Sequence, residues 1–192
     1  EGIYLWDSRG QRYIDASSGP IAVNIGHGNA RVIEAADRQM RKVAYASRAF
    51  FENEANSLLA DIVTQLAGPG LERAFFVSGG SEATESAMKL VRQHALTQGQ
   101  GSRWKVLSRS PSYHGGTLGA LAISGDPVSE ASFGGMARPM PKVPPPVSHR
   151  LAEGHTVESL AEHCAAELEA TIVREGAETV LAFFLGPVGG VA

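Results

Sequence analysis

The sequence has one cysteine and no long apolar run. Cys164 excludes a disulfide within the chain, and we expect it to be a buried, unreactive thiol in a helix. The six histidines do not cluster at ligand spacing, so we predict no metal site. No apolar stretch approaches the ~20 residues that span a bilayer, and the first residues lack a basic and then apolar signal segment. We therefore expect a soluble, cytoplasmic protein.

The chain also lacks a charge imbalance. Lys and Arg number 17 against 20 Asp and Glu, which gives a formal net charge of −3 with no basic stripe. This composition makes nucleic acid a poor candidate for a partner. The 192 residues, 43% of them hydrophobic, are enough to form a real core. Neither end looks like a natural terminus, and we expect the chain to be a piece of a larger protein.

The most informative stretch covers residues 73–96. An apolar run predicts a strand at 73–77, the step Ser78-Gly79-Gly80-Ser81 predicts a turn, and apolar residues at helical spacing predict a helix over 81–96. The first backbone N–H groups of such a helix lack partners within it, and adjacent glycines let an anion approach them. A phosphate fits this turn, and an ordinary capped turn fits it equally well.

The rest of the pattern indicates alternating helices and strands. A hairpin is predicted over 2–15, helices over 29–43, 53–66 and 156–175, a short helix or turn over 118–123, and strands over 104–108 and 179–185. The strand, helix, strand order suggests a parallel sheet, with residues 111–117 at the carboxyl edge where such sheets bind ligands. Residues 16–28 are expected to form an irregular buried loop. Residues 125–150 contain six prolines and are expected to form a long surface connection or lid, not a helix.

Two stretches together carry a family resemblance. Phe76-Val77-Ser78-Gly79-Gly80-Ser81-Glu82-Ala83, followed by Glu85, Ala87, Lys89 and Leu90, and Tyr113-His114-Gly115-x-Thr117-x-Gly119-Ala120 resemble the class III aminotransferases, which use pyridoxal 5′-phosphate (PLP). The resemblance covers essentially the whole chain but only the N-terminal half of a typical member. It implies an α/β fold, the three-layer α/β/α PLP-transferase architecture called fold type I. Residues 1–47 would be a small-domain segment, a β-hairpin plus helix, and residues 48–192 the first part of the PLP-binding large domain.

The resemblance also implies where the cofactor and substrate lie. Gly80 and Ser81, with Gly79 in the same turn, match the residues that bind the cofactor's phosphate, and Tyr113 matches the aromatic ring that stacks on the cofactor. His114 would either help to position that ring or make a plain hydrogen bond. Substrate-pocket candidates are Ile21, which would face the substrate, and Phe50 and Phe51, which fit either the pocket or the core. His27 is expected to organise its loop by a hydrogen bond.

Two requirements of PLP chemistry are missing. The family's Schiff-base lysine and the acid that pairs with the pyridinium nitrogen belong to later motifs, and Lys42, Lys89, Lys105 and Lys142 do not stand at a suitable site. No catalytic residue is therefore predicted in this fragment, which alone would be inactive.

The sequence departs from the family pattern at two positions. Gly186 replaces the usual Glu, which puts a Glu–Arg substrate switch in doubt, and Thr84 replaces the commoner Asn, a conservative change.

The complete enzyme is predicted to move an amino group from an amine or ω-amino acid to an oxo acid by a ping-pong mechanism, as a homodimer. Two alternatives remain open. One is a PLP-dependent aminomutase or decarboxylase of the same fold. The other is a non-enzymatic phosphate-binding α/β module, which would explain the Gly79-Gly80-Ser81 turn but not the Tyr113 loop.

Overall fold

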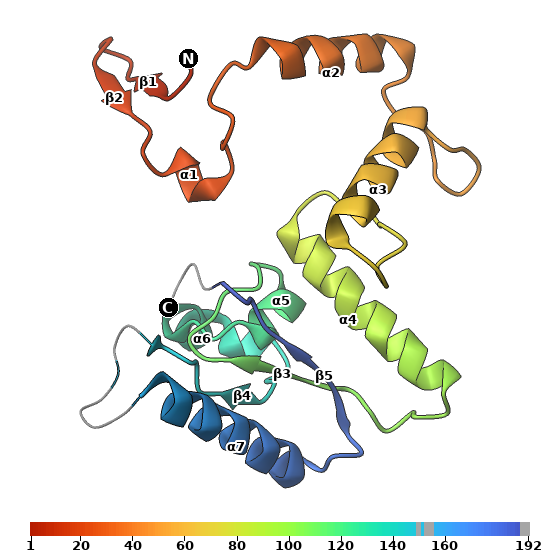
Figure 1. The fold of residues 1–192 in the computed structure, drawn as a ribbon, viewed down its shortest axis with the longest axis vertical. Coiled ribbons are helices and arrows are strands. Elements are labelled where there is room, and N and C mark those ends of the chain that lie inside the picture. The colour runs from red at the N-terminus through yellow and green to blue at the C-terminus, as the bar shows by residue number, and fades with distance from the viewer. Residues whose placement is uncertain (149–150, 152–155, 189–192) are drawn as a thin grey trace. The chain divides into compact units, whose positions relative to one another are not determined.

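The computed structural model describes residues 1–148, 151 and 156–188 (Figure 1). The chain divides into two compact units, Glu1–Phe75 and Phe76–Ala192, which we call the first and the second unit. The assignment of 1–47 to a small domain and of 48–192 to the first part of a large domain stays a prediction. The last residues of the proline-rich segment, 149–150, and of the chain, 189–192, lie outside the described residues.

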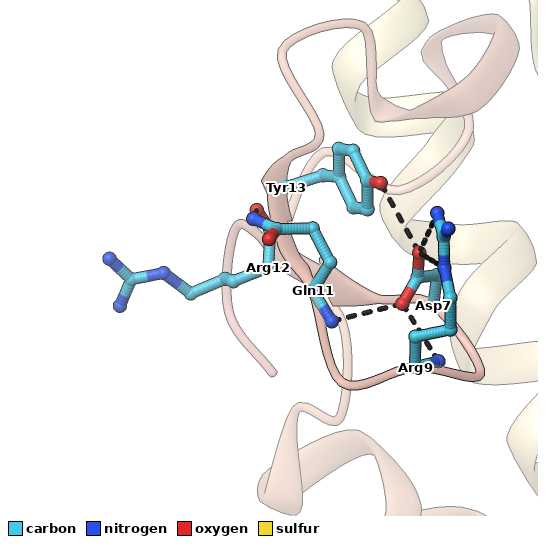
Figure 2. A network of polar contacts seen from close by, with 5 residues as sticks. All are labelled: Asp7, Arg9, Gln11, Arg12 and Tyr13. Carbon is cyan, nitrogen blue, oxygen red and sulfur yellow. Dashed lines mark hydrogen bonds and ion pairs between the residues drawn. The ribbon is translucent and has the colours of Figure 1, made fainter.

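The first unit opens with the predicted hairpin. Strands β1 (Tyr4–Trp6) and β2 (Arg12–Ile14) pair antiparallel. Asp7 organises the connecting turn, because its carboxylate accepts the backbone N–H groups of Arg9 and Gln11, both at 2.9 Å, and the Tyr13 hydroxyl at 3.3 Å (Figure 2). Gly10 has a φ of +80°, a conformation that glycine adopts without steric penalty. The turn is thus fixed by local residues alone.

The segment after the hairpin differs from the prediction. Residues 16–28 contain a short helical turn, α1 (Ser18–Ile21), and most of their side chains are exposed rather than buried. Nothing in the first unit covers them, since none of its described side chains is buried. His27 does organise the loop as predicted: its Nε2 lies 2.8 Å from Oδ2 of Asp15, which ties the loop to the end of the hairpin.

Helices α2 (Ala30–Lys42) and α3 (Glu54–Ala67) confirm the predictions for 29–43 and 53–66. An asparagine caps each start: Oδ1 of Asn29 accepts the Val32 N–H at 3.3 Å, and Oδ1 of Asn53 accepts the Ala55 N–H at 3.0 Å. Gly68 ends α3 with a φ of +85°. Because caps act within one turn of the chain, the sequence specifies these boundaries locally.

The second unit is built on a parallel sheet in the order β4-β3-β5 (Figure 1). Its elements, in chain order, are α4 (Gly80–Thr97), β3 (Lys105–Arg109), α5 (Leu118–Ile123), α6 (Pro127–Phe133), η1 (Gly134–Met136), β4 (Lys142–Val143), α7 (Val157–Glu175) and β5 (Val180–Phe184). Both outer strands pair parallel with the central β3. The predictions for α4, β3, α5, α7 and β5 are confirmed, including Thr156 as the N-cap of α7, where it forms a capping box with Ser159.

The core of the second unit lies where α5 meets the sheet. Val106 and Leu107 of β3 and Ala120 and Ile123 of α5 are buried, as are Ala95, Val143 and Val180 from the surrounding elements. Helix α5 contacts β3, α7 contacts β4, and α4 contacts both β5 and α5. The packing therefore fixes α4 and α5 relative to the carboxyl end of β3, which is where the candidate site lies.

Three predictions about this unit are wrong. Residues 73–77 form no strand in the described structure: a strand requires a hydrogen-bonded neighbour, and neither described sheet pairs with them. The segment 125–150 contains α6, η1 and β4, since Asp126 and Pro127 together start a helix: the Asp126 carboxylate accepts the N–H groups of Val128 and Ser129. Cys164 is half-buried rather than buried.

Candidate cofactor site

The start of α4 is arranged to receive an anion. Gly79 is the N-cap, its backbone is extended, and no side chain caps the helix. Within the described part of the chain, no acceptor bonds the N–H groups of Gly80, Ser81 or Glu82. An 18-residue helix adds the positive end of its dipole at this point. A Cβ placed on Gly80 would meet no atom within 4 Å, so there is open space beside these donors.

The Tyr113 loop is hydrogen-bonded to the same helix. The Gly116 N–H donates to Oγ of Ser81 at 3.0 Å, and Oγ1 of Thr84 donates to the His114 carbonyl at 2.8 Å. Residues separated by 30 and 35 positions are thereby joined at the carboxyl end of β3. The structure brings together the two parts, Gly79-Gly80-Ser81 and Tyr113-His114, that the sequence predicts as a cofactor site. Their role toward a cofactor stays a prediction.

Tyr113 and His114 have opposite environments. Tyr113 is 63% exposed. The His114 ring packs edge-on against Phe184, with ring centroids 6.4 Å apart and planes at 86°. Its backbone N–H donates to Oγ of Ser124 at 2.9 Å. Its Nε2 is buried and has no hydrogen-bond partner in the described part of the molecule.

Burial lowers the pKa of His114 below the ordinary value of 6.5, and the nearby charges of Lys142 and Arg109 lower it further. The imidazole is therefore neutral at neutral pH. In the unfolded chain it takes up a proton at a higher pH than in the folded protein, so folding stability falls as the pH drops below about 6.5.

We predict that His114→Gln reduces this pH dependence. The fall in the thermal midpoint of the complete enzyme, without added cofactor, between pH 7.5 and pH 5.5 should be smaller in the variant than in the unmodified protein, because one titrating group is lost. An equal fall in the two proteins would contradict the neutral, buried state of His114.

Charged groups hold both ends of α5, which follows the Tyr113 loop. At its start, Oε1 of Glu85 accepts the Thr117 hydroxyl at 2.7 Å and the Gly119 N–H at 3.1 Å. At its end, Nζ of Lys142 donates to the Ala122 carbonyl at 2.6 Å, and burial lowers the pKa of this amine. These signs match the helix dipole. Lys142 thus has a structural role here.

Three of the residues that hold the loop were not singled out as site residues from the sequence. Thr84, taken there as a conservative replacement, donates to the loop, and Glu85 and Lys142 hold α5. The sequence did contain a signal for Thr84 and Glu85. They stand three and four positions after Ser81, so all three residues share one helix face. A polar row next to a phosphate turn indicates a helix face with a polar partner.

The remaining candidates are placed as follows. Ile21, Phe50 and Phe51 belong to the first unit and are 73%, 82% and 66% exposed, so the two phenylalanines are not core residues of this unit. Phe51 lines a cavity of about 520 Å³ between α2 and α3. Their predicted role toward a substrate stays a prediction.

Two further residues lie in the second unit. Glu82 lies exposed in the first turn of α4. Gly186 follows β5, and its carbonyl accepts a hydrogen bond from the Arg109 guanidinium.

The other lysines have separate environments. Lys42 pairs with Glu54 at 3.0 Å, Lys105 pairs with Glu175 at 2.9 Å, and Lys89 is exposed on α4. Among the described residues, no three His, Cys, Asp or Glu side chains are arranged to hold a metal ion. No helix in the described ranges is long and apolar enough to cross a membrane.

The residues present fit PLP in part. Free backbone N–H groups at a helix start and a serine hydroxyl are the donors that a phosphate requires, and an exposed tyrosine ring suits the flat face of a pyridine. That these residues bind a phosphorylated, planar ligand stays a prediction.

Comparison with known proteins assigns this chain to a family. The profile of the family described as aminotransferase class-III matches residues 1–192, and the chain belongs to that family. It is 34% identical, over 195 residues, to the hypotaurine/taurine–pyruvate aminotransferase of Paracoccus denitrificans, covering 100% of this chain and 42% of the relative.

Solved structures show the same fold. The (S)-enantioselective omega-transaminase of Thermomicrobium roseum matches with a TM-score of 0.91 and 39% identity, over 100% of this chain and 42% of that structure. The omega transaminase of Pseudomonas jessenii, in complex with PMP, matches with a TM-score of 0.93 and 31% identity, over 99% and 42%. The predicted class III membership and fold type are confirmed. The chain spans less than half the length of these relatives.

Proposed function

We propose that the complete enzyme carrying this chain is a PLP-dependent aminotransferase that moves an amino group from an amine or ω-amino acid to an oxo acid by a ping-pong mechanism. The proposal rests on one observation: two hydrogen bonds, Gly116 to Ser81 and Thr84 to His114, join the start of α4 to the Tyr113 loop. Family membership and the names of the relatives, which include a taurine–pyruvate enzyme and two omega-transaminases, support amine-type donors. A homodimer and a cytoplasmic location stay predictions.

In this proposal, α4 provides the phosphate anchor. The N–H groups of Gly80 and Ser81 are available to phosphate oxygens. The oxygen of the Ser81 hydroxyl accepts the Gly116 N–H, and the hydroxyl proton is left to donate to the phosphate. Gly116 thus orients the hydroxyl of Ser81. Hydrogen bonds to a charged group are the stronger ones, so this arrangement favours a dianionic phosphate.

The loop provides the surface for the ring. Tyr113 would stack on the cofactor, and His114, neutral and packed against Phe184, would hold the base of the loop rather than supply charge. Bound PLP supplies an electron sink for amino-group exchange. The lysine and the acid that this chemistry needs would come from outside these residues. Gly186, with no side chain, leaves more space near the cofactor than the usual glutamate.

The proposal is tested with the complete enzyme, PLP, and taurine or another amine as donor to pyruvate. We expect alanine as a product, detected by chromatography. Release of carbon dioxide, or movement of the amino group within one substrate, would identify a decarboxylase or an aminomutase and contradict the proposal. Failure to bind PLP at all would favour the non-enzymatic module.

We predict that Ser81→Ala weakens PLP binding by about tenfold or more, because a hydrogen bond to a charged phosphate and the contact that holds Gly116 are both lost. Titration of the apoenzyme with PLP, followed by absorbance, measures the change. Ser86→Ala makes the same substitution on the same helix, at a residue with no described part in the site, and should leave the dissociation constant unchanged. Equal effects of the two variants would argue against a phosphate at Ser81.

A further inference from the structure

Glu85 occupies a position between the phosphate helix and the Tyr113 loop that the proposed function does not use. Its Oε1 accepts two hydrogen bonds, from the Thr117 hydroxyl and from the Gly119 N–H. Thr117 is the N-cap of α5, yet its side chain accepts no backbone N–H of that helix. Its hydroxyl donates to Glu85 instead, and the Gly119 N–H donates to the same carboxylate oxygen. A carboxylate from α4 therefore caps α5 in place of the usual local side chain.

The contact between Glu85 and the α5 backbone is close. A Cβ added to Gly119 would lie 2.6 Å from both carboxylate oxygens and 2.8 Å from the carboxyl carbon. Gly119 is not in the left-handed region, so proximity rather than backbone conformation makes glycine necessary here. The carboxylate thus lies against the loop backbone with no room for a methyl group.

The position of Glu85 on α4 links the two halves of the site. It lies one helical turn after Ser81, on the same face, and α4 is a single helix from Gly80 to Thr97. Three contacts from this face hold the loop: Ser81 to Gly116, Thr84 to His114, and Glu85 to the start of α5. Of the three side chains, only Glu85 carries a charge, and hydrogen bonds to charged groups are stronger.

We infer that Glu85 is a positioning residue for the cofactor. By capping α5 from α4, it fixes the position of the Tyr113 ring relative to the phosphate anchor at the start of α4. This rests on the proposed function, since it concerns how PLP is held. Glu85 touches neither phosphate nor ring and acts only through the loop. A merely structural cap would change the melting temperature, but not the geometry of the bound cofactor at saturation.

The test uses the complete enzyme and two readouts: the PLP dissociation constant, and the visible circular dichroism band that an asymmetric site induces in bound PLP at saturation. Glu85→Ala should raise the dissociation constant about tenfold and reduce the band, since two hydrogen bonds to a charged group are lost. Glu85→Gln should give a smaller rise, about threefold, and keep most of the band, because an amide oxygen at the same position can accept both bonds but without the charge. Lys89→Gln, at an exposed residue on the same helix, is the control.

Gly119→Ala disturbs the same contact from the α5 backbone, against which the Glu85 carboxylate lies. Alone it should reproduce the loss seen with Glu85→Ala, because the new methyl group displaces the carboxylate. Combined with Glu85→Ala it should add no further loss, since the clash is removed with the carboxylate. Should Glu85→Ala fail to fold, Gly119→Ala decides by itself, and an unchanged dissociation constant and band would overturn the inference.

The outcomes separate this inference from the function. An unmodified enzyme that does not bind PLP contradicts the proposed function. An unmodified enzyme that binds PLP, with Glu85→Ala giving the same dissociation constant and band, contradicts only the inference. Additive losses in the double variant would also contradict it, because they would show that the two residues act independently.

Discussion

Replacing Gly115 with alanine is expected to lower PLP affinity about 100-fold. Its φ is +137°, and an added Cβ would lie 2.6 Å from Oγ of Ser81 and 2.9 Å from Cβ of Ala120. A strained backbone and an overpacked contact together cost about 3 kcal/mol. The clash falls on the serine that anchors the phosphate and on the helix that follows the loop, so both halves of the site must separate.

Gly116→Ala is the matched control for this prediction. A Cβ on Gly116 would meet no atom within 4 Å, and the residue does not have a positive φ. Titration of both apoenzymes with PLP gives the comparison. If Gly115→Ala binds PLP within threefold of Gly116→Ala, the close approach of the loop to α4 does not exist in the working enzyme.

Replacing Gly125 with alanine is expected to give the largest loss of stability. An added Cβ would lie 2.5 Å from both the Arg109 carbonyl oxygen and Cα of Ser110, which are backbone atoms and cannot swing aside. Gly125 also exchanges two backbone hydrogen bonds with Ser112, at 2.8 and 3.3 Å. Separating these segments would cost about 3 kcal/mol, which corresponds to a fall of about 3 °C in the thermal midpoint of an enzyme more than twice as long as this chain.

Gly135→Ala serves as the control for Gly125→Ala, because a Cβ there would meet no atom within 4 Å. Thermal unfolding of the complete enzyme, followed by calorimetry, measures both variants. Equal midpoints would show that the end of β3 and the segment after α5 are not in contact. The Tyr113 loop leaves β3 at this point, so the same result would remove the support of the site.

Elements with local signals were predictable from the sequence. Asn29, Asn53 and Thr156 cap helices that begin where expected, and the Asp7 turn forms the hairpin. Residues 73–77 have an apolar pattern typical of a strand, but a strand needs a neighbour that the pattern does not specify. Helix α6 was missed because a high proline count concealed Asp126-Pro127, an ordinary helix start.

In the candidate site, too, local features could be predicted from the sequence and tertiary contacts could not. The motif residues identified Ser81 and Tyr113, and the structure joins their segments through Gly116 and Thr84. The role of Glu85 could not be derived in this way, because its partners lie 32 and 34 positions away and their approach depends on how α4, α5 and β3 pack. Which polar side chains lie on one helix face is a local property, whereas what that face contacts is set by the tertiary fold.

The central claim is that the start of α4 and the Tyr113 loop together hold PLP. A crystal structure of the complete enzyme with PLP tests it most directly. We expect phosphate oxygens within about 3 Å of the Gly80 and Ser81 N–H groups and of the Ser81 hydroxyl, with the Tyr113 ring stacked on the pyridine ring. A phosphate bound elsewhere, or a Tyr113 ring turned away from the cofactor, would contradict the claim.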